Sequence, residues 1–414
     1  MDFYEELCYR GLIKDVSDAE GFKERLKQPL TVYCGFDPSA DSLHVGSLQQ
    51  IVLLKRYQDR GHKIIFLCGG ATGMIGDPRP TTERRLLTAE EIDYNVACIK
   101  EQVKQFFDFT NEAIMVNNYD WTVNINVIDF LRDYGKYFNV SYMLSKDVVA
   151  SRLEKGISYT EFSYAILQSL DWLHLYREYD CIVQVGGSDQ WGNLTSGIEL
   201  IRKVEGDKAK VYAVTSPLVS RSDGSKFGKS EGANIWIDPR QTNAYEFYQF
   251  WLNTPDEDVI DYLKRFSMRA PKEIESLAES LREAAHLRAA QKALAEEMTE
   301  MVHGAEGLVL AKKISETLFG GDFEILSREE LQIALHGMKE FELAETMNVV
   351  DLLVAAEIAS SKREAREWLN QGSITINGKK VDSTEVKVGK DSAFYQEYTI
   401  IRRGKKNYYV IKHR

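Results

Sequence analysis

Short apolar runs alternate with helical patterns through the first half of the chain, and no other feature limits its fold as strongly. Four runs predict buried strands: Leu30–Gly35, Lys63–Cys68, Ile114–Val116 and Asp180–Val185. Between them, Leu48–Arg60 and Glu161–Leu175 carry apolar residues at three- and four-residue spacing, which is typical of helices packed on a sheet. The alternation predicts an α/β fold with a parallel sheet, in which ligands bind at the carboxyl ends of the strands.

The second half of the chain has a different character, and a length of 414 residues favours two or three domains. Residues from about Thr242 to Leu318 are rich in Ala, Glu, Leu, Lys and Arg and predict a helical domain. The end of the chain predicts a compact module of helices and short strands, with Asn377-Gly378 as a hairpin turn. The predicted domains are therefore residues 1–241, 242–319 and 349–414, with residues 320–348 as a linker that has some local structure.

Composition narrows the class of protein further. No segment approaches the ~20 apolar residues that span a bilayer, and the acidic N-terminus resembles no targeting peptide, so we expect a cytoplasmic protein. The five cysteines form no CxxC pair and no Cys/His cluster, so neither a protein-bound metal nor a disulfide framework is expected. The net charge is −11, yet residues 351–414 contain 13 Lys and Arg against 8 Asp and Glu. This basic end fits a nucleic-acid-binding module, although a solvated basic face has the same composition.

Two segments carry chemistry suited to phosphates. His44-Val45-Gly46-Ser47 precedes the helix predicted from Leu48, and free backbone N–H groups at a helix N-terminus favour an anion. Lys226-Phe227-Gly228-Lys229-Ser230 lies in a loop rich in Gly and Ser, where two lysines three residues apart could close over a polyphosphate. Taken alone, each segment is also explained by a chance match or by a solvated loop.

A polar stripe lies on the second predicted helix. Tyr164, Gln168 and Asp171 are three or four residues apart and share one face of an otherwise apolar element. Because buried polar groups need partners, the stripe is either a binding surface or a hydrogen-bonded core network. The Gly-rich run before Asp77 also has two interpretations, since its glycines could approach a ligand or only make turns. Neither GxGxxG nor the full phosphate-loop pattern occurs in it.

In this order, the segments resemble the signatures of the class I aminoacyl-tRNA synthetases, which are written HIGH and KMSKS. Residues 33–38, 69–77 and 184–193, with the polar stripe, resemble the bacterial tyrosyl-tRNA synthetases specifically. The resemblance covers essentially the whole chain, and the end of the chain resembles the S-four RNA-binding domain. It implies a Rossmann-like parallel-sheet catalytic domain, an α-helical domain and a small αβ S-four-like RNA-binding domain.

The resemblance also implies a reaction and assigns roles to matching positions. The reaction is activation of tyrosine with ATP to tyrosyl-adenylate and pyrophosphate, followed by transfer of tyrosine to the 3′ end of tRNA(Tyr). The expected tyrosine-binding residues are Tyr33 and Asp171 at the phenol, Asp77, Tyr164 and Gln168 at the ammonium group, and Gln184. The expected catalytic residues are His44, Gly46, Lys226, Lys229 and Ser230. The expected ATP or adenylate contacts are Gly35, Asp37, His44, Gly46, Gly186, Asp189, Gln190 and Lys229. The expected tRNA contacts are Lys362, Arg363, Arg366, Arg402, Arg403, Lys405 and Lys406.

Mg²⁺ is expected with ATP, held mostly by phosphates and water, and the family implies a homodimer. The sequence departs from the family pattern at Ser47, where many relatives have His, and in the loop after Asp77, which lacks a lysine that Arg79 or Arg84 could replace. Two alternatives remain at this level: a tryptophan-specific ligase of the same fold, and a non-catalytic RNA-binding or splicing protein on the same scaffold. Tyr33 with Asp171 favours a phenol substrate.

Overall fold

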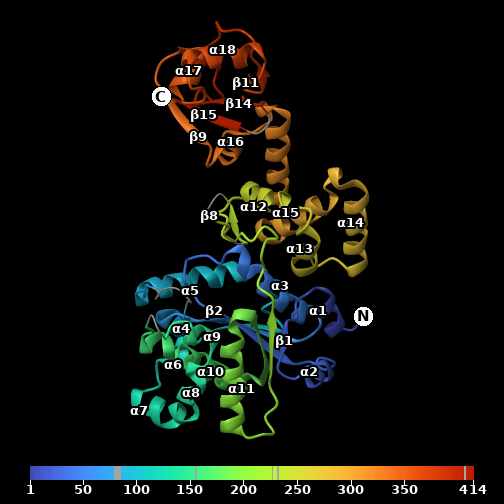
Figure 1. Cartoon of the computed structure of the whole chain (residues 1–414), viewed down its shortest axis with the longest axis vertical. Coiled ribbons are helices and arrows are strands. Elements are labelled where there is room, and N and C mark those ends of the chain that lie inside the picture. The colour runs from blue at the N-terminus through green and yellow to red at the C-terminus, as the bar shows by residue number, and fades with distance from the viewer. Residues whose placement is uncertain (79–84, 154–155, 226, 231–232, 405–406) are drawn as a thin grey trace. The chain divides into compact units, whose positions relative to one another are not determined.

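The computed structural model describes residues 1–78, 85–153, 156–225, 227–230, 233–404 and 407–414 (Figure 1). These residues form two compact units. The N-terminal unit contains residues 1–242 and 250–302, and the C-terminal unit contains residues 243–249 and 303–414. In the described residues, no helix has both the length and the apolar character needed to cross a membrane.

A six-stranded sheet forms the centre of the N-terminal unit, in the order β1-β6-β5-β2-β3-β4. Its strands are β1 (Asp15–Val16), β2 (Thr31–Phe36), β3 (Lys63–Cys68), β4 (Ala113–Asn117), β5 (Cys181–Gly187) and β6 (Tyr212–Ser216). All neighbouring pairs are parallel except β1 and β6. The chain therefore adds β3 and β4 on one side of β2 and later returns to add β5 and β6 on the other.

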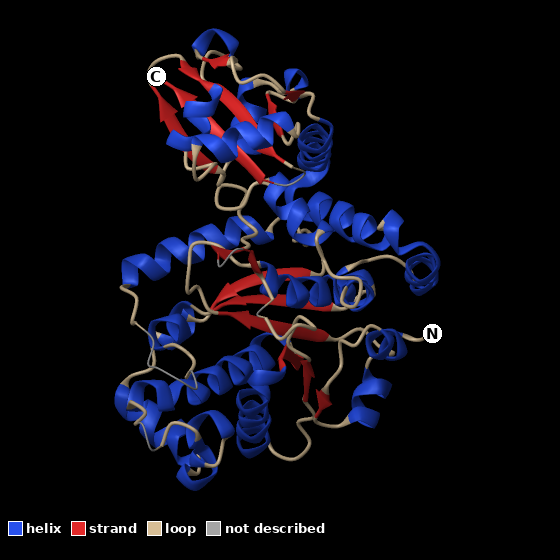
Figure 2. Ribbon diagram, turned by 45° about the horizontal axis from the view of Figure 1, so that its top comes forward, coloured by secondary structure: helices blue, strands red, loops and turns tan. Residues whose placement is uncertain are grey.

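Helices cover both faces of this sheet (Figure 2). Those of the first 242 residues are α1 (Phe3–Tyr9), α2 (Ala19–Arg25), α3 (Val45–Asp59), α4 (Gly70–Ile75), α5 (Ala89–Val103), α6 (Tyr119–Thr122), α7 (Val127–Asp129), α8 (Val140–Leu144), α9 (Asp147–Ala150), α10 (Tyr159–Tyr179) and α11 (Trp191–Glu205). On one face, Tyr33, Ile65 and Leu67 pack in a buried cluster with apolar residues of α10 and α11. Side chains alternate along a strand, so Phe36 and Phe66 lie on the opposite face, where their rings stack with centroids 4.4 Å apart.

A short two-stranded hairpin, β7 (Lys229–Ser230) with β8 (Ala233–Asn234), follows the sheet, and four helices come next: α12 (Ala244–Leu252), α13 (Val259–Phe266), α14 (Pro271–Ala284) and α15 (Ala289–Gly320). Gly304 interrupts α15, because its φ of 73° and ψ of 175° are not helical. The helical character predicted for residues 242–318 is confirmed. However, α12 and α15 both contribute residues to the two compact units.

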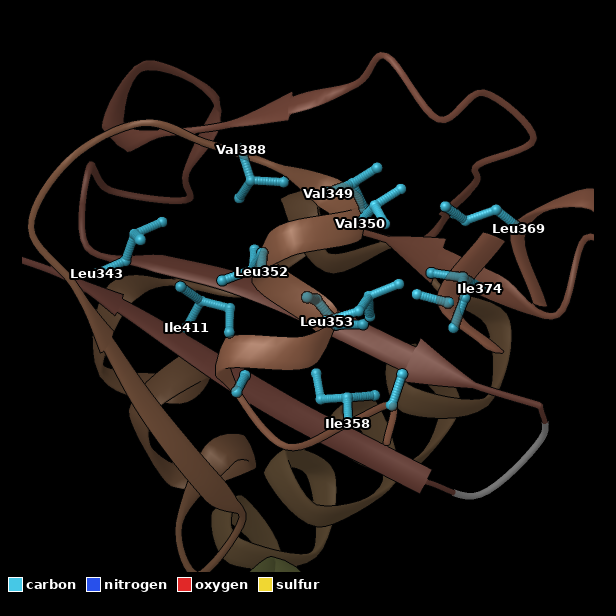
Figure 3. Packing of buried hydrophobic residues seen from close by; sticks show 14 residues of the cluster. Leu343, Val349, Val350, Leu352, Leu353, Ile358, Leu369, Ile374, Val388 and Ile411 are labelled. Atoms are coloured by element: carbon cyan, nitrogen blue, oxygen red, sulfur yellow. The ribbon is translucent and has the colours of Figure 1, made fainter. Parts of the chain in front are cut away.

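The C-terminal unit contains a five-stranded sheet in the order β12-β11-β14-β15-β9. Its elements are α16 (Arg328–Leu335), β9 (Lys339–Leu343), β10 (Met347–Asn348), α17 (Val349–Ala355), α18 (Lys362–Asn370), β11 (Ile374–Ile376), β12 (Lys379–Lys380), β13 (Lys387–Val388), β14 (Tyr398–Arg403) and β15 (Asn407–His413). Helices α17 and α18 pack on one face through a cluster that includes Leu353, Leu369, Ile374 and Ile411 (Figure 3). On the other face, Ile400 and Val410 pack with apolar residues of α15 and α16.

The predicted strands and helices of the first half are confirmed, with ends shifted by a few residues. The predicted Asn377-Gly378 turn is also confirmed, since both residues have positive φ and connect the antiparallel strands β11 and β12. The sequence prediction missed β1 and β6. Residues 320–348, expected as a linker with local structure, contribute α16 and β9 to the core of the C-terminal unit, because β9 pairs in parallel with β15. The borders at 241, 319 and 348 stay predictions.

Candidate active site

The strand order places a ligand site at one position of the N-terminal sheet. The order along the chain reverses between β2 and β5, which are parallel neighbours, and open α/β sheets bind ligands outside the carboxyl ends of strands at this point. Asp37 directly follows β2, and Gly186 lies near the end of β5. The expected ATP contacts Gly35, Asp37, Gly186, Asp189 and Gln190 therefore all lie at the same edge of the sheet.

The segment His44-Val45-Gly46 begins α3 beside this edge. His44 is the N-cap residue, and its Nδ1 accepts a hydrogen bond from the Gly46 N–H at 2.9 Å. That bond defines the tautomer with the proton on Nε2, which leaves Nε2 as a donor. Partial desolvation by nearby protein atoms lowers the pKa of His44 below its usual 6.5, while part of the residue stays in contact with water. The neutral ring can donate its Nε2–H to an anion, and the dipole of the helix N-terminus favours negative charge at this position.

The lysine-containing loop is connected to the same helix start through backbone hydrogen bonds. Val45 N–H donates to the Ile235 carbonyl at 2.9 Å, and Ile235 N–H donates to the Gly228 carbonyl at 2.9 Å. Gly228 has a φ of +83°, and a Cβ there would lie 3.1 Å from Val45 Cγ1, so this approach requires glycine. Lys229, the next residue, is exposed. The two signatures predicted from the sequence are therefore neighbours in space.

A continuous chain of hydrogen bonds runs through the edge of the sheet and ends at Asp171. Tyr164 Oη donates to Asp37 Oδ2 at 2.8 Å, and Thr72 Oγ1 donates to Asp37 Oδ1 at 2.7 Å. Asn118 Nδ2 donates to Thr72 Oγ1 at 3.0 Å and to Asp171 Oδ2 at 2.9 Å. This chain of hydrogen bonds connects residues of α4 and α10 with Asp37, which follows β2, and Asn118, which follows β4, so two members of the predicted polar stripe belong to one network.

Asp171 is a buried carboxylate, 2 % exposed. Its second oxygen, Oδ1, accepts from Trp121 Nε1 at 2.9 Å. Burial raises the pKa of Asp171 to about 7, although the two hydrogen bonds oppose the shift. The Tyr33 hydroxyl is also buried, and it has no hydrogen-bond partner among the described residues. Burial, reinforced by the charge of Asp171, raises the pKa of Tyr33 well above 10, so Tyr33 is neutral and its hydroxyl is an available donor.

A second carboxylate is held at the start of α11. Asp77 Oδ2 accepts from Gln190 Nε2 at 2.8 Å, and Asp77 Oδ1 accepts from Asn193 Nδ2 at 3.1 Å. Asn193 Nδ2 also lies 3.1 Å from Gln190 Oε1. The structure therefore joins Asp77, expected at the amino acid, to Gln190, expected at the nucleotide.

Two further members of the expected tyrosine site, Gln168 and Gln184, each have a buried amide oxygen without a hydrogen-bond partner among the described residues. Unpartnered buried acceptors are uncommon in folded proteins and favour a ligand at this position. Lys226 lies outside the described residues, as do Arg79 and Arg84, and the side chain of Ser230 is not described. Among the described residues, no group of three or more His, Cys, Asp or Glu side chains could hold a metal ion.

Sequence reasoning missed Thr72, Asn118 and Trp121, which hold Asp37 and Asp171 in place. A signal for Asn118 was available, because it follows a predicted strand at its carboxyl end. Trp121 lies three residues further along the chain and is harder to assign from sequence, since its role depends on how α6 meets α10.

The expected RNA contacts lie in the C-terminal unit. Lys362, Arg363 and Arg366 are exposed on α18, and Lys362 pairs with Asp351 at 2.7 Å. The Arg403 guanidinium, on β14, lies 4.1 Å from the centre of the Trp368 ring, which belongs to α18. Arg402 instead points toward Tyr408, with Nη1 3.4 Å from its hydroxyl. Lys405 and Lys406 lie outside the described residues.

Comparison with known families agrees with this fold. Residues 24–320 match the model of the class I tRNA synthetases for tryptophan and tyrosine, and residues 330–411 match a tyrosine–tRNA ligase SYY-like C-terminal domain. The chain therefore belongs to the class I tRNA synthetases.

Full-length relatives narrow the family to one substrate. The tyrosine–tRNA ligases of Staphylococcus carnosus and Listeria welshimeri are 50% and 48% identical to the chain; the alignments cover all of this chain and 99% and 100% of the relatives. Within its class, the chain is thus a member of the tyrosine–tRNA ligases.

Solved structures give the same result. A C-terminally truncated mitochondrial tyrosyl-tRNA synthetase of Aspergillus nidulans is 31% identical, with a TM-score of 0.68 over 77% of this chain and 94% of that chain. A tyrosyl-tRNA synthetase of Archaeoglobus fulgidus, solved with L-tyrosine, has a TM-score of 0.58 at 17% identity. The match covers 74% of this chain and 100% of that chain, and at this identity it shows a likeness of fold alone.

Proposed function

We propose that the pocket around Asp171 and Tyr33 binds the tyrosine substrate of this ligase, and that the start of α3 with the Lys229 loop binds its ATP. The observation that carries the proposal is the pairing of a buried carboxylate with a buried, unpartnered hydroxyl. Asp171 accepts from the substrate phenol, and Tyr33 Oη donates to it. A substrate without this hydroxyl would leave the buried Tyr33 hydroxyl without an acceptor and Asp171 without its third donor, which costs about 1–3 kcal/mol.

The ammonium group of tyrosine requires acceptors. Tyr164 Oη donates to Asp37, so its lone pairs stay available to accept from the ammonium group. Asp77 offers its carboxylate charge, and Gln168 Oε1 is a buried acceptor without a partner among the described residues. Gln184 Oε1 is a further acceptor of the same kind, which we assign to the amino-acid pocket.

The triphosphate lies against the helix start in this proposal. His44 and the Gly46 backbone meet the phosphates, Lys226 and Lys229 neutralise charge on the transferring group, and Ser230 adds a hydroxyl donor. Gly35, Asp37, Gly186, Asp189 and Gln190 surround the nucleoside part or the adenylate. Mg²⁺ enters with ATP, held by phosphate oxygens and water, which is the usual mode for this ion.

The reaction depends on alignment of tyrosine with ATP and requires no nucleophile from the protein. The tyrosine carboxylate attacks the α-phosphorus of ATP, the bond to the β-phosphate bridging oxygen breaks, and pyrophosphate leaves. A terminal ribose hydroxyl of tRNA then attacks the carbonyl carbon of the adenylate and releases AMP. Positioned donors stabilise the charge that develops on the phosphates in the first step.

The C-terminal unit is proposed to bind tRNA. Lys362, Arg363, Arg366 and Arg403 place positive charge on α18 and the adjoining end of β14, with the Trp368 ring beside Arg403. Phosphate contacts are the natural role of such groups. Arg402, Lys405 and Lys406 belong to the same proposal.

We also propose a homodimer in the cytoplasm. Helices α6 to α8 and the turn between them expose several large apolar side chains: Val123, Val127, Ile128, Leu131 and Val140, each more than half exposed. A pocket of about 180 Å³, lined by Thr122, Ile125, Val127, Phe130 and Leu167, adjoins them. Clustered exposed apolar groups mark interaction surfaces. A second copy of the chain is the partner that the family suggests.

Amino-acid-dependent ATP–pyrophosphate exchange tests the assignment. Tyrosine should support exchange, whereas phenylalanine and tryptophan at equal concentration should not. Exchange with tryptophan would favour the tryptophan-specific alternative, and no exchange with any amino acid would favour a non-catalytic RNA-binding protein.

A further inference from the structure

A buried cluster of hydrogen bonds lies one helical turn beyond His44, and none of its side chains belongs to the residues assigned to tyrosine or ATP. Gln49 Nε2 donates to Ser216 Oγ at 2.9 Å and to the Pro217 carbonyl at 3.1 Å. Gln50 Nε2 donates to the same Ser216 Oγ at 2.6 Å. We call Gln49, Gln50 and Ser216 the Ser216 cluster.

The Ser216 hydroxyl uses its full hydrogen-bonding capacity. It accepts from both glutamines and donates to the Gly186 carbonyl at 3.5 Å, which accounts for one donor and two acceptor positions. Ser216 is 1 % exposed and Gln49 2 %, so water does not compete for these bonds. Directional bonds of this kind fix one relative placement of their partners, whereas apolar contacts alone are non-directional.

The cluster joins three segments that the proposed ATP site uses. Gln49 and Gln50 belong to the first turns of α3, which begins with Val45 and Gly46 directly after the His44 cap. Ser216 ends β6 and is in register with Gly187 at the end of β5. Pro217, whose carbonyl accepts from Gln49, begins the stretch that leads to Lys229. A single hydroxyl therefore connects the helix start, the end of β5 and the start of the lysine loop.

We propose that Ser216, together with Gln49 and Gln50, is a positioning element for ATP: it holds the α3 start at a fixed distance from Gly186 so that both contact the nucleotide at once. This proposal rests on the proposed roles of His44, Gly46 and Gly186. Misplacement of a reacting group by about 1 Å costs about 100-fold in rate, so small movements of α3 suffice to slow activation. Tyrosine binding does not depend on the cluster, because the Asp171 pocket is built from other residues.

The test compares variants of the cluster with an equally buried glutamine elsewhere in the same unit. Ser216→Ala removes the shared hydroxyl, Gln50→Leu removes one donor, and Ser216→Thr keeps the hydroxyl. Gln291→Leu is the control, because Gln291 is fully buried and its Nε2 donates to Asp256 at 2.6 Å, outside the proposed site. Each variant is measured for kcat of ATP–pyrophosphate exchange, KM for ATP, and equilibrium binding of tyrosine without ATP.

Ser216→Ala and Gln50→Leu should lower kcat at least about tenfold. The Kd for tyrosine should stay within about twofold, and this retained binding also shows that the variants fold. Ser216→Thr should recover most of the rate, and Gln291→Leu should retain it. The positioning role is overturned if Ser216→Ala keeps kcat within twofold, or if Gln291→Leu loses as much as Ser216→Ala. His44→Ala is run in parallel: if it leaves kcat intact, the proposed ATP site itself is wrong, whereas a large loss with an unaffected Ser216→Ala refutes only the cluster.

Discussion

In our proposal, Asp171 determines which amino acid the pocket accepts. Its carboxylate is buried and receives two donors from the protein, and the substrate phenol is the third in our proposal. Asp171→Ala should lower kcat/KM for tyrosine activation at least about a thousandfold, because a buried ionic hydrogen bond contributes about 3 kcal/mol and Asn118 and Trp121 also lose their acceptor. The measurement is tyrosine-dependent pyrophosphate exchange.

Asp180→Asn is the matched control for that experiment, because Asp180 is the exposed cap residue at the end of the same helix. It should retain activity within about twofold. Near-normal turnover of Asp171→Ala would remove the assignment of the phenol site.

The pKa of Asp171 gives the pocket a pH dependence. Burial raises this pKa to about 7, so the carboxyl group is protonated below pH 7 and no longer accepts as an anion. We therefore expect kcat/KM for tyrosine to be constant above pH 8 and to fall about tenfold per unit below pH 7, since kcat/KM reports groups of the free enzyme. A flat profile between pH 5.5 and 8 would contradict this.

The raised pKa of Asp171 also affects the free energy of unfolding, and this effect has the opposite dependence on pH. The folded pKa lies above the unfolded value of about 4, so the folded state binds the proton more tightly. The contribution of Asp171 to stability is therefore largest below pH 4 and is lost as the pH rises to 7. The protein retains this destabilising charge at the pH where tyrosine binding needs it.

Individual site residues differed in how well sequence could identify them. Tyr164 and Asp171 were predicted as a stripe because helical periodicity alone places them together. Thr72 and Asn118 come from separate elements and meet only because β3 and β4 are neighbours in the sheet. That adjacency depends on the strand order, which no local pattern encodes.

At the level of elements, the lysine loop is anchored by an aromatic cluster. The Phe227 ring lies 5.1–5.9 Å, centre to centre, from the rings of Phe250, Trp251, Tyr262 and Phe266. Each such pair contributes about 0.5–1.5 kcal/mol beyond apolar burial. Helix α13 also holds the loop at its base, since Tyr262 Oη donates to the Ser220 carbonyl at 3.0 Å.

Phe227→Ala should therefore release the loop, raise KM for ATP and lower kcat of exchange at least about tenfold, while tyrosine binding is unchanged. Phe227→Leu should keep more than half of the activity because it retains apolar burial. Phe319→Ala, which changes a side chain that is 89 % exposed, is the control. Equal effects on ATP and tyrosine would argue for general destabilisation.

One of the two strands that the sequence prediction missed, β6, has buried polar residues at its end. β6 ends in Thr215 and Ser216, which are polar yet buried, so the strand lacks a long apolar run. Thr215 donates to Asp15, and Ser216 belongs to the cluster described above, so both polar groups are satisfied by tertiary contacts. Of the strands that were predicted, β2, β3 and β5 bury nearly continuous apolar runs, whereas β4 is an edge strand whose apolar residues are mostly only partly buried.

At the scale of the whole molecule, tyrosine activation and tRNA binding are proposed for different units. Deleting part of the C-terminal unit is a poor test of this proposal. Deletion after Asn348 would remove β14 and β15, leave β9 unpaired, and expose Leu331 and Leu335 of α16. Substitutions on the surface avoid this damage.

Arg363→Glu with Arg366→Glu reverses charge on the exposed face of α18. We expect tRNA aminoacylation to fall at least about tenfold near 0.1 M salt, with pyrophosphate exchange within twofold, because phosphate contacts depend on these cations. Lys14→Glu with Lys27→Glu makes the same charge change in the N-terminal unit and should leave both activities intact. Equal loss of exchange and aminoacylation would contradict an RNA-binding role.

The apolar surface on α6 to α8 predicts the assembly state. Val127→Glu with Ile128→Glu should convert a dimer to a monomer in analytical ultracentrifugation, because two charges would be buried in the interface. Val309→Glu, at an equally exposed apolar side chain, should stay dimeric. A monomeric unsubstituted protein would refute the proposed homodimer.

The parallel pairing of β9 with β15 has a consequence for biosynthesis. One partner, Lys339–Leu343, leaves the ribosome long before the other, Asn407–His413. The sheet of the C-terminal unit can therefore close only after residues 407–413 have left the ribosome, whereas the sheet of the N-terminal unit is complete once Ser216 has done so. A prematurely terminated chain would present β9 as an open strand edge, the kind of template on which polypeptides aggregate.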